Sequence, residues 1–278
     1  LVILVSVAAV SNLRSLAEVR SQNQVFPGKT WQTSTPETEG LDSRFLNEAT
    51  GYLKQHSGSD GVNQLLIIRN GKIVWAGKDV EVVHGIWSGT KSFTSTCLGL
   101  LIADGRCSLE TRAAEFLPEM ATAYPDLTLR HFTTMTSGYR AQGDEPRGSY
   151  SHGPSRTSFV PNGKPLFLPG SHYAYWDSAM NQFGNVLTQI AGKPLEELFR
   201  ERIASKIGMN PDRWRWGAFE KNDGIKVNGG AGNSGNNIFT SATEMARLGW
   251  LFLNHGRWVS EQLLPSDWVT QATSGQVP

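Results

Sequence analysis

Two residues able to do nucleophilic chemistry lie three positions apart in residues 84–96, which read HGIWSGTKSFTST. At this spacing Ser88 and Lys91 share one helix face, with Cβ atoms about 5–6 Å apart. The positive end of a helix dipole favours an alkoxide on Ser88. Desolvation in an apolar helix lowers the pKa of a lysine, so a neutral Lys91 could act as base toward Ser88. The alternative is Ser88 as an N-cap and Lys91 as a solvated side chain.

Two glycine patterns suggest nucleotide binding, and neither fits. A phosphate-binding loop needs four residues between its glycines and then Gly-Lys-Ser or Gly-Lys-Thr; here Gly85 and Gly89 enclose three, and Thr90 precedes Lys91. Residues 230–235 match GxGxxG, but no alternating strand–helix pattern surrounds them, and the next helix is expected only at Ser241. We interpret residues 230–235 as a flexible glycine loop.

The elements that must position Ser88 and Lys91 follow from periodicity. Apolar residues at helical spacing predict a helix over 41–55, and Asn70-Gly71 between two β-branched runs predicts a hairpin. The helix after Ser88 is apolar all round, which is typical of a buried helix, and Gly105 ends it. Further predictions are a surface loop over 141–170, helices over 181–191 and 194–207, and a capping box at 241–244 that opens another helix.

Composition narrows the class of protein. The 278 residues are 39% hydrophobic and include nine Trp, enough for a substantial core. A formal charge of +1, with no long basic run, gives no indication of nucleic-acid binding. Cys97 and Cys107 are too few for a disulfide scaffold; one bridge and two free buried thiols are both compatible with the sequence.

The N-terminal run LVILVSVAAV is too short to span a bilayer. It resembles the apolar part of a signal peptide whose charged start is missing. We therefore expect a signal-peptide remnant and linker over residues 1–26, and export to the periplasm or the extracellular space. Retention of the stretch as a membrane anchor, or a buried N-terminal strand or helix, is the alternative.

Several ordered segments resemble the serine β-lactamase and penicillin-binding-protein family. Residues 88–91, SGTK, with the helix that follows, are similar to the family's active-site helix. TLRHFTTMTSGY at 128–139, PGSHYAYWDSAMNQFG at 169–184 and FTSATEMARLGWLFLNHGRW at 239–258 resemble later segments in the same order. Tyr175 stands at the tyrosine of the family's Tyr-x-Asn motif, which relates the chain to the class C branch with its esterases, peptidases and nylon-oligomer (aminohexanoate-dimer) hydrolases.

Two departures accompany this resemblance. Asp177 stands where the family usually has Asn, and an ionised Asp only accepts hydrogen bonds. Asp177 is therefore expected either to pair with Lys91 or to bind a substrate amine or amide, which argues against penicillins as substrates. The family's third motif, Lys- or His-x-Gly on a strand, is not found, and we expect it, one oxyanion amide and the remaining strands beyond residue 278.

The resemblance implies an α+β fold over residues 27–278, with an antiparallel sheet flanked by helices and a mostly helical inserted subdomain. It also implies a serine hydrolase that cleaves an ester, amide or peptide in a small molecule through an acyl-enzyme on Ser88. Lys91 and Tyr175 are the expected general base and acid, and Asp177 and Trp176 are expected to contact substrate. Neither a metal nor an organic cofactor is required. A non-catalytic penicillin-binding-like sensor or scaffold is the alternative.

Overall fold

The computed structural model describes residues 2–3, 24–144, 158–220, 224–232 and 234–276. Most of the predicted signal-peptide remnant and linker lies outside these residues, so export stays a prediction. The chain divides into two compact units. Unit 1 is Leu1–His84, Lys206–Trp214 and Thr240–Glu261; unit 2 is Gly85–Ser205, Arg215–Phe239 and Gln262–Pro278. In the part of the chain that the structure describes, no helix combines the length and the hydrophobicity needed to cross a membrane.

Unit 1 is built on a four-stranded sheet in the order β1-β3-β4-β2. Its strands are β1 (Val2–Ile3), β2 (Gln32–Thr33), β3 (Leu66–Arg69) and β4 (Lys72–Ala76). The central pair β3–β4 is the predicted antiparallel hairpin, whereas β1 and β2 pair in parallel at the edges. The hairpin prediction is confirmed at its turn: Asn70 and Gly71 have φ of 53° and 81°, as a type I′ turn requires.

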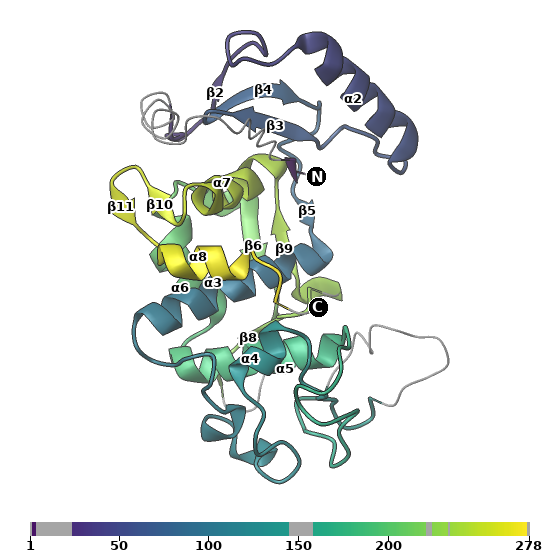
Figure 1. The fold of residues 1–278 in the computed structure, drawn as a ribbon, viewed down its shortest axis with the longest axis vertical. Coiled ribbons are helices and arrows are strands. Elements are labelled where there is room, and N and C mark those ends of the chain that lie inside the picture. The colour runs from purple at the N-terminus through teal and green to yellow at the C-terminus, as the bar shows by residue number, and fades with distance from the viewer. Residues whose placement is uncertain (1, 4–23, 145–157, 221–223, 233, 277–278) are drawn as a thin grey trace. The chain divides into compact units, whose positions relative to one another are not determined.

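Helices α2 (Ser43–His56) and α7 (Ala242–Leu253) belong to unit 1. So does β10 (Arg257–Trp258), which pairs with β11 (Glu261–Gln262), the strand in which the chain passes into unit 2. Leu46 and Leu53 of α2 pack against Ile67 and Val74 of the hairpin. Figure 1 shows α2 and α7 on opposite sides of these strands. Side chains alternate across a strand, and β3 is buried on both faces because helices cover both.

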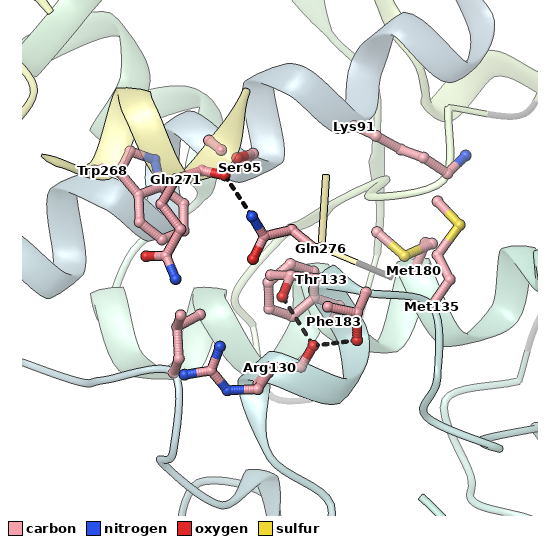
Figure 2. A pocket seen from close by; sticks show the side chains of 13 residues that line it. Lys91, Ser95, Arg130, Thr133, Met135, Met180, Phe183, Trp268, Gln271 and Gln276 are labelled. Atoms are coloured by element: carbon pink, nitrogen blue, oxygen red, sulfur yellow. Dashed lines mark hydrogen bonds between the residues drawn. The ribbon is translucent and has the colours of Figure 1, made fainter. Parts of the chain in front are cut away.

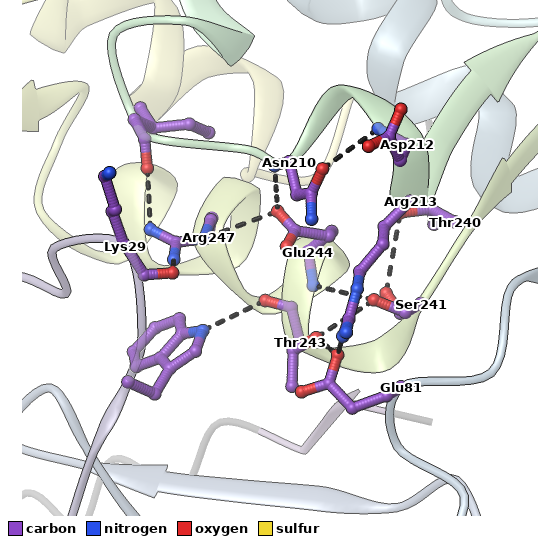
Figure 3. Close-up of polar contacts among 12 residues, drawn as sticks. Lys29, Glu81, Asn210, Asp212, Arg213, Thr240, Ser241, Thr243, Glu244 and Arg247 are labelled. Atoms are coloured by element: carbon purple, nitrogen blue, oxygen red, sulfur yellow. Dashed lines mark hydrogen bonds and ion pairs between the residues drawn. The ribbon is translucent and has the colours of Figure 1, made fainter.

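A buried ion pair anchors α7 within unit 1 (Figure 3). Ser241 caps the helix by accepting from the Glu244 amide, as predicted. The Glu244 carboxylate accepts from the Asn210 amide (3.2 Å) and lies 3.4 Å from Arg247 Nε. The Arg247 guanidinium also donates to the carbonyls of Ile207 and Lys29, both at 2.9 Å. Burial raises the pKa of Glu244 and lowers that of Arg247, and the shared contacts offset the cost of burying both charges.

Unit 2 is mostly helical, as the predicted inserted subdomain requires. Its helices are α3 (Thr90–Ala103), α4 (Leu129–Thr133), α5 (Asp177–Ala191), α6 (Leu195–Phe199) and α8 (Ser266–Ala272). Short helical turns run over Trp87–Gly89, Ala113–Glu115, Pro118–Met120, Arg200–Ala204 and Ser234–Asn236. Strands β7 (Ala218–Phe219) and β8 (Val227–Asn228) form a small antiparallel pair. The predicted helix over 194–207 is therefore split, because α6 continues as a π-helical turn at residue 200.

Helix α3 is the core of unit 2, which confirms the prediction of a buried helix. Nine of its residues are buried, and it contacts α5, α6 and α8. Cys97 and Cys107 are both free thiols. Three remaining strands, β5 (His84–Gly85), β6 (Trp214–Trp216) and β9 (Ile238–Thr240), pair in the order β5-β9-β6 and contain residues where the chain passes from one unit to the other.

Candidate active site

Ser88 lies exposed in the 3-10 turn Trp87–Gly89 that leads into α3. The turn is held on both sides: the Ile86 amide donates to the Ile238 carbonyl, and the Ile238 amide donates to Thr90 Oγ1, each at 2.9 Å. Trp87 has φ of 50°, a conformation that costs a non-glycine residue roughly 1–3 kcal/mol and is often found at active sites. The backbone thus fixes the serine hydroxyl at the N-terminal end of a buried helix.

Lys91, the second residue of α3, is surrounded by groups that interact with a positive charge. Its Nζ donates to the Ala231 carbonyl at 2.6 Å and to Ser88 Oγ at 3.3 Å. Asp177 Oδ1 lies 3.6 Å from the same nitrogen, and the Tyr175 ring centroid lies 4.6 Å from it. The Lys91 side chain is only 12% exposed. The amine therefore meets a carboxylate, a carbonyl oxygen and an aromatic face at the same time.

Tyr175 completes the cluster from the segment before α5. Its hydroxyl oxygen lies 2.5 Å from Ser88 Oγ, a short hydrogen bond. The backbone between Tyr175 and Asp177 is extended, with φ −133° and ψ 111° at Trp176. An extended residue places its two neighbours' side chains on the same side of the chain, so Tyr175 and Asp177 both face the α3 pair. The structure therefore brings together four of the five residues singled out from the sequence.

The fifth, Trp176, is directed away from this cluster. Its side chain is buried, and its indole N–H donates to Asp144 Oδ2 at 2.7 Å. This position gives Trp176 a supporting contact inside unit 2, and the predicted contact with substrate stays a prediction. The predicted surface loop over 141–170 is wrong at its start, because Ala141 and Asp144 are buried; residues 145–157 lie outside the described part of the chain.

The prediction of a flexible glycine loop is also wrong for Gly230–Gly232. A Cβ on Gly230 would lie 2.0 Å from the Met180 carbonyl oxygen, and one on Gly232 would lie 2.0 Å from the Trp87 carbonyl oxygen. The Ala231 amide donates to Asn181 Oδ1 at 3.1 Å. The segment is therefore packed between α5 and the Ser88 turn, and its glycines allow the close approach that brings the Ala231 carbonyl to Lys91.

A pocket of about 130 Å³ adjoins the stem of Lys91 (Figure 2). Its wall is formed by α3, α4, α5 and α8, and includes Arg130, Met135, Met180 and Trp268. Figure 2 shows the Lys91 amine turned away from Gln276, another residue of the pocket wall. Neither Ser88 nor Tyr175 is among the described residues that line this pocket.

Comparisons with known proteins agree with this arrangement. The model of the Beta-lactamase family matches residues 51–277. A beta-lactamase of Pseudomonas fluorescens is 28% identical over 155 residues, which cover 51% of this chain and 43% of the relative. The chain spans less than half the length of the first curated relatives that it matches.

Two solved structures share the fold. One is a Bacillus anthracis protein provisionally named a 6-aminohexanoate-dimer hydrolase, with a TM-score of 0.55 and 23% identity, covering 73% of this chain and 57% of that one. The other, EstCE1, a hydrolase with promiscuous acyltransferase activity, has a TM-score of 0.57 and 16% identity, covering 81% and 76%. The chain belongs to the Beta-lactamase family, a group of serine hydrolases with an α+β fold.

Proposed function

We propose that the protein is a serine hydrolase that cleaves an ester or amide bond through an acyl-enzyme on Ser88. The observation that carries the proposal is the pair of contacts to Ser88 Oγ, from Tyr175 Oη at 2.5 Å and from Lys91 Nζ at 3.3 Å. A serine hydroxyl within hydrogen-bond reach of groups that can serve as its general base is the arrangement that activates a serine nucleophile.

In this proposal Lys91 and Tyr175 act together as the base and then as the acid, because the Lys91 amine lies against both Ser88 Oγ and the Tyr175 ring. As Oγ bonds to the carbonyl carbon, the serine proton moves to this pair, which then gives a proton to the departing alcohol or amine. Water attacks the acyl-enzyme in the second half-reaction and releases the acid. The Ser88 amide, in the first turn where helical N–H groups lack intrahelical partners, supplies one oxyanion donor.

Asp177 narrows the proposed substrates. Its carboxylate is 14% exposed and lies beside Lys91, so it presents acceptor oxygens at the edge of the site. These oxygens can accept from an amine or amide N–H near the scissile carbonyl, but they offer no donor to a carbonyl there, such as the acyl amide carbonyl of a penicillin. We therefore propose carboxylesterase or linear-amide hydrolase activity, in preference to β-lactam hydrolysis.

Intact-mass spectrometry of the full-length protein mixed with a p-nitrophenyl ester tests the assignment. We expect a transient acyl adduct on the wild type and none on Ser88→Ala, because that variant has no nucleophile. Tyr175→Phe should slow acylation by about 10²-fold or more, since it removes one of the two groups that act as the base. Unchanged acylation in either variant would contradict the role given to that residue.

The second candidate is a non-catalytic penicillin-binding-like sensor or scaffold. The observation that favours it is the Asp177–Lys91 ion pair, because a carboxylate there lowers the positive charge that Lys91 offers to Ser88. A folded wild-type protein that forms no adduct with any of a panel of short esters, D-peptides and linear amides would favour this candidate.

A further inference from the structure

A buried carboxylate lies behind the Tyr175–Asp177 segment. Asp144 is 2% exposed. Its Oδ2 accepts hydrogen bonds from the Trp176 indole N–H at 2.7 Å and from the Ser178 hydroxyl. The Ala141 amide is a third, longer donor at 3.4 Å. Trp176 and Ser178 are the sequence neighbours of Asp177. One carboxylate oxygen of Asp144 therefore binds the residues on both sides of Asp177.

This burial is costly and needs compensation. The other oxygen, Oδ1, has no hydrogen-bond partner among the described residues, and a buried ionised carboxylate is destabilising unless donors surround it. The compensation comes from the start of α5. Asp144 meets the side chains of the N-cap residue Trp176 and of Ser178 in the first turn, where the positive end of the helix dipole favours a negative charge. These contacts therefore hold the Asp144 side chain against the N-terminal end of α5.

The direction of the side chains links Asp144 to the site. Because Trp176 is extended, its indole points inward to Asp144 while Tyr175 and Asp177 point outward to Ser88 and Lys91. Rotation or displacement of Trp176 would therefore move the Tyr175 hydroxyl from its position 2.5 Å from Ser88 Oγ. An error of about 1 Å at a reacting group can cost on the order of 10²-fold in rate.

We propose that Asp144 is a positioning residue for the Ser88 reaction, and that it acts through Trp176 and Ser178 to hold Tyr175 and Asp177 in place. This role rests on the proposed serine hydrolase function. Asp144 does not touch the reacting atoms in this proposal; its effect is on how fast each folded molecule is acylated and not on how tightly substrate binds.

Single-turnover acylation of the full-length protein by the p-nitrophenyl ester, followed by intact mass, tests the role. The amplitude of adduct counts competent sites and the rate constant reports their geometry. Asp144→Ala should form as much adduct as the wild type, but with a rate constant about 10- to 100-fold lower. The ester concentration that gives half the maximal rate should stay within about twofold of the wild-type value. Asp144→Asn keeps an acceptor oxygen for Trp176 and Ser178, and should recover a large part of the loss.

Two further variants complete the design. Trp176→Phe removes one donor and little volume, and should slow acylation less than Asp144→Ala, with the double variant no slower than Asp144→Ala alone. Asp126→Asn changes an exposed aspartate that pairs with Arg112 at 3.4 Å and should behave as wild type.

Each outcome separates this role from the proposed function. Adduct on the wild type together with unchanged rate constants in Asp144→Ala overturns the positioning role alone, as does a loss of amplitude with no loss of rate. If Asp144→Ala does not fold, a wild-type rate constant in Trp176→Phe overturns it. Absence of adduct on the wild type and on every variant overturns the proposed function, and the positioning role with it.

Discussion

At the scale of single residues, the proposed choice of substrate depends on Asp177. The carboxylate neutralises part of the Lys91 charge and presents only acceptors to a substrate. An amide at the same position would present a donor as well. In the proposed reaction, this one side chain influences both the activation of Ser88 and the choice of acyl group.

Replacing this carboxylate gives a direct test. Asp177→Asn should raise the acylation rate with a penicillin relative to that with the p-nitrophenyl ester by about fivefold, because one new hydrogen bond to the acyl amide contributes about 1 kcal/mol. The two rates are measured on the same preparation by intact mass. A ratio that stays at its wild-type value would show that Asp177 does not discriminate between the substrates.

The residues of the candidate site differ in how far the sequence alone predicts their positions. Ser88 and Lys91 are recognisable because one helical turn brings them together, so their spacing carries their geometry. The Lys91–Ala231 contact joins residues 140 apart, and it involves a backbone carbonyl, which any residue could supply. Asp144 lies in a stretch expected only as a surface loop, and its contacts lie 32 and 34 residues further along the chain.

At the scale of elements, glycines decide how closely the Gly230–Gly232 segment approaches its neighbours. A methyl group on Gly230 has no room beside the Met180 carbonyl, whereas Gly235 has nothing within 4 Å of the corresponding position. The GxGxxG pattern alone does not distinguish a glycine that makes the backbone flexible from one that allows close packing. Asn70-Gly71 and the Ser241 cap predict the hairpin turn and the start of α7 correctly, because each signal depends only on adjacent residues.

Alanine substitution separates these two kinds of glycine. Gly230→Ala should lower the melting temperature by several degrees and slow acylation, because the added Cβ forces the segment and the Ala231 carbonyl away from α5 and Lys91. Gly235→Ala is the matched control and should leave both quantities unchanged. Calorimetry and the ester assay give the two readouts, and equal effects from the two substitutions would refute this account of the segment.

At the scale of the whole molecule, stability in acid depends on a carboxylate far along the chain from Ser88. Glu39 accepts hydrogen bonds from Lys72 Nζ and Asn70 Nδ2, both at 2.8 Å, and ties the hairpin turn to the segment before α2. These bonds, with Lys72 first, lower the pKa of Glu39 from 4.5 to about 2. A lowered carboxyl pKa means that the native state favours the ionised form more than the unfolded chain does.

Ionised Glu39 stabilises the native state, and this stabilisation is lost when the carboxylate is protonated. The contribution of Glu39 is fully present above about pH 4.5 and is lost as the pH falls toward 2. At most about 3 kcal/mol of unfolding free energy depends on it. Chemical denaturation at pH 6, 4 and 3 should show a steeper loss of stability for the wild type than for Glu39→Gln, which has no proton to gain. Parallel curves for the two proteins would contradict this role.

Because Cys97 is buried, the rate at which its thiol reacts reports how often the surrounding structure opens. Its thiol is fully buried in α3, two to three turns beyond Ser88, and burial raises its pKa well above the usual range. Cys107, half-buried with a pKa raised to about 11, lies just past the same helix. An alkylating reagent can reach Cys97 only in molecules whose α3 has separated from its neighbours. The lag between modification of Cys107 and of Cys97 therefore records how often α3, the helix that follows Ser88, opens.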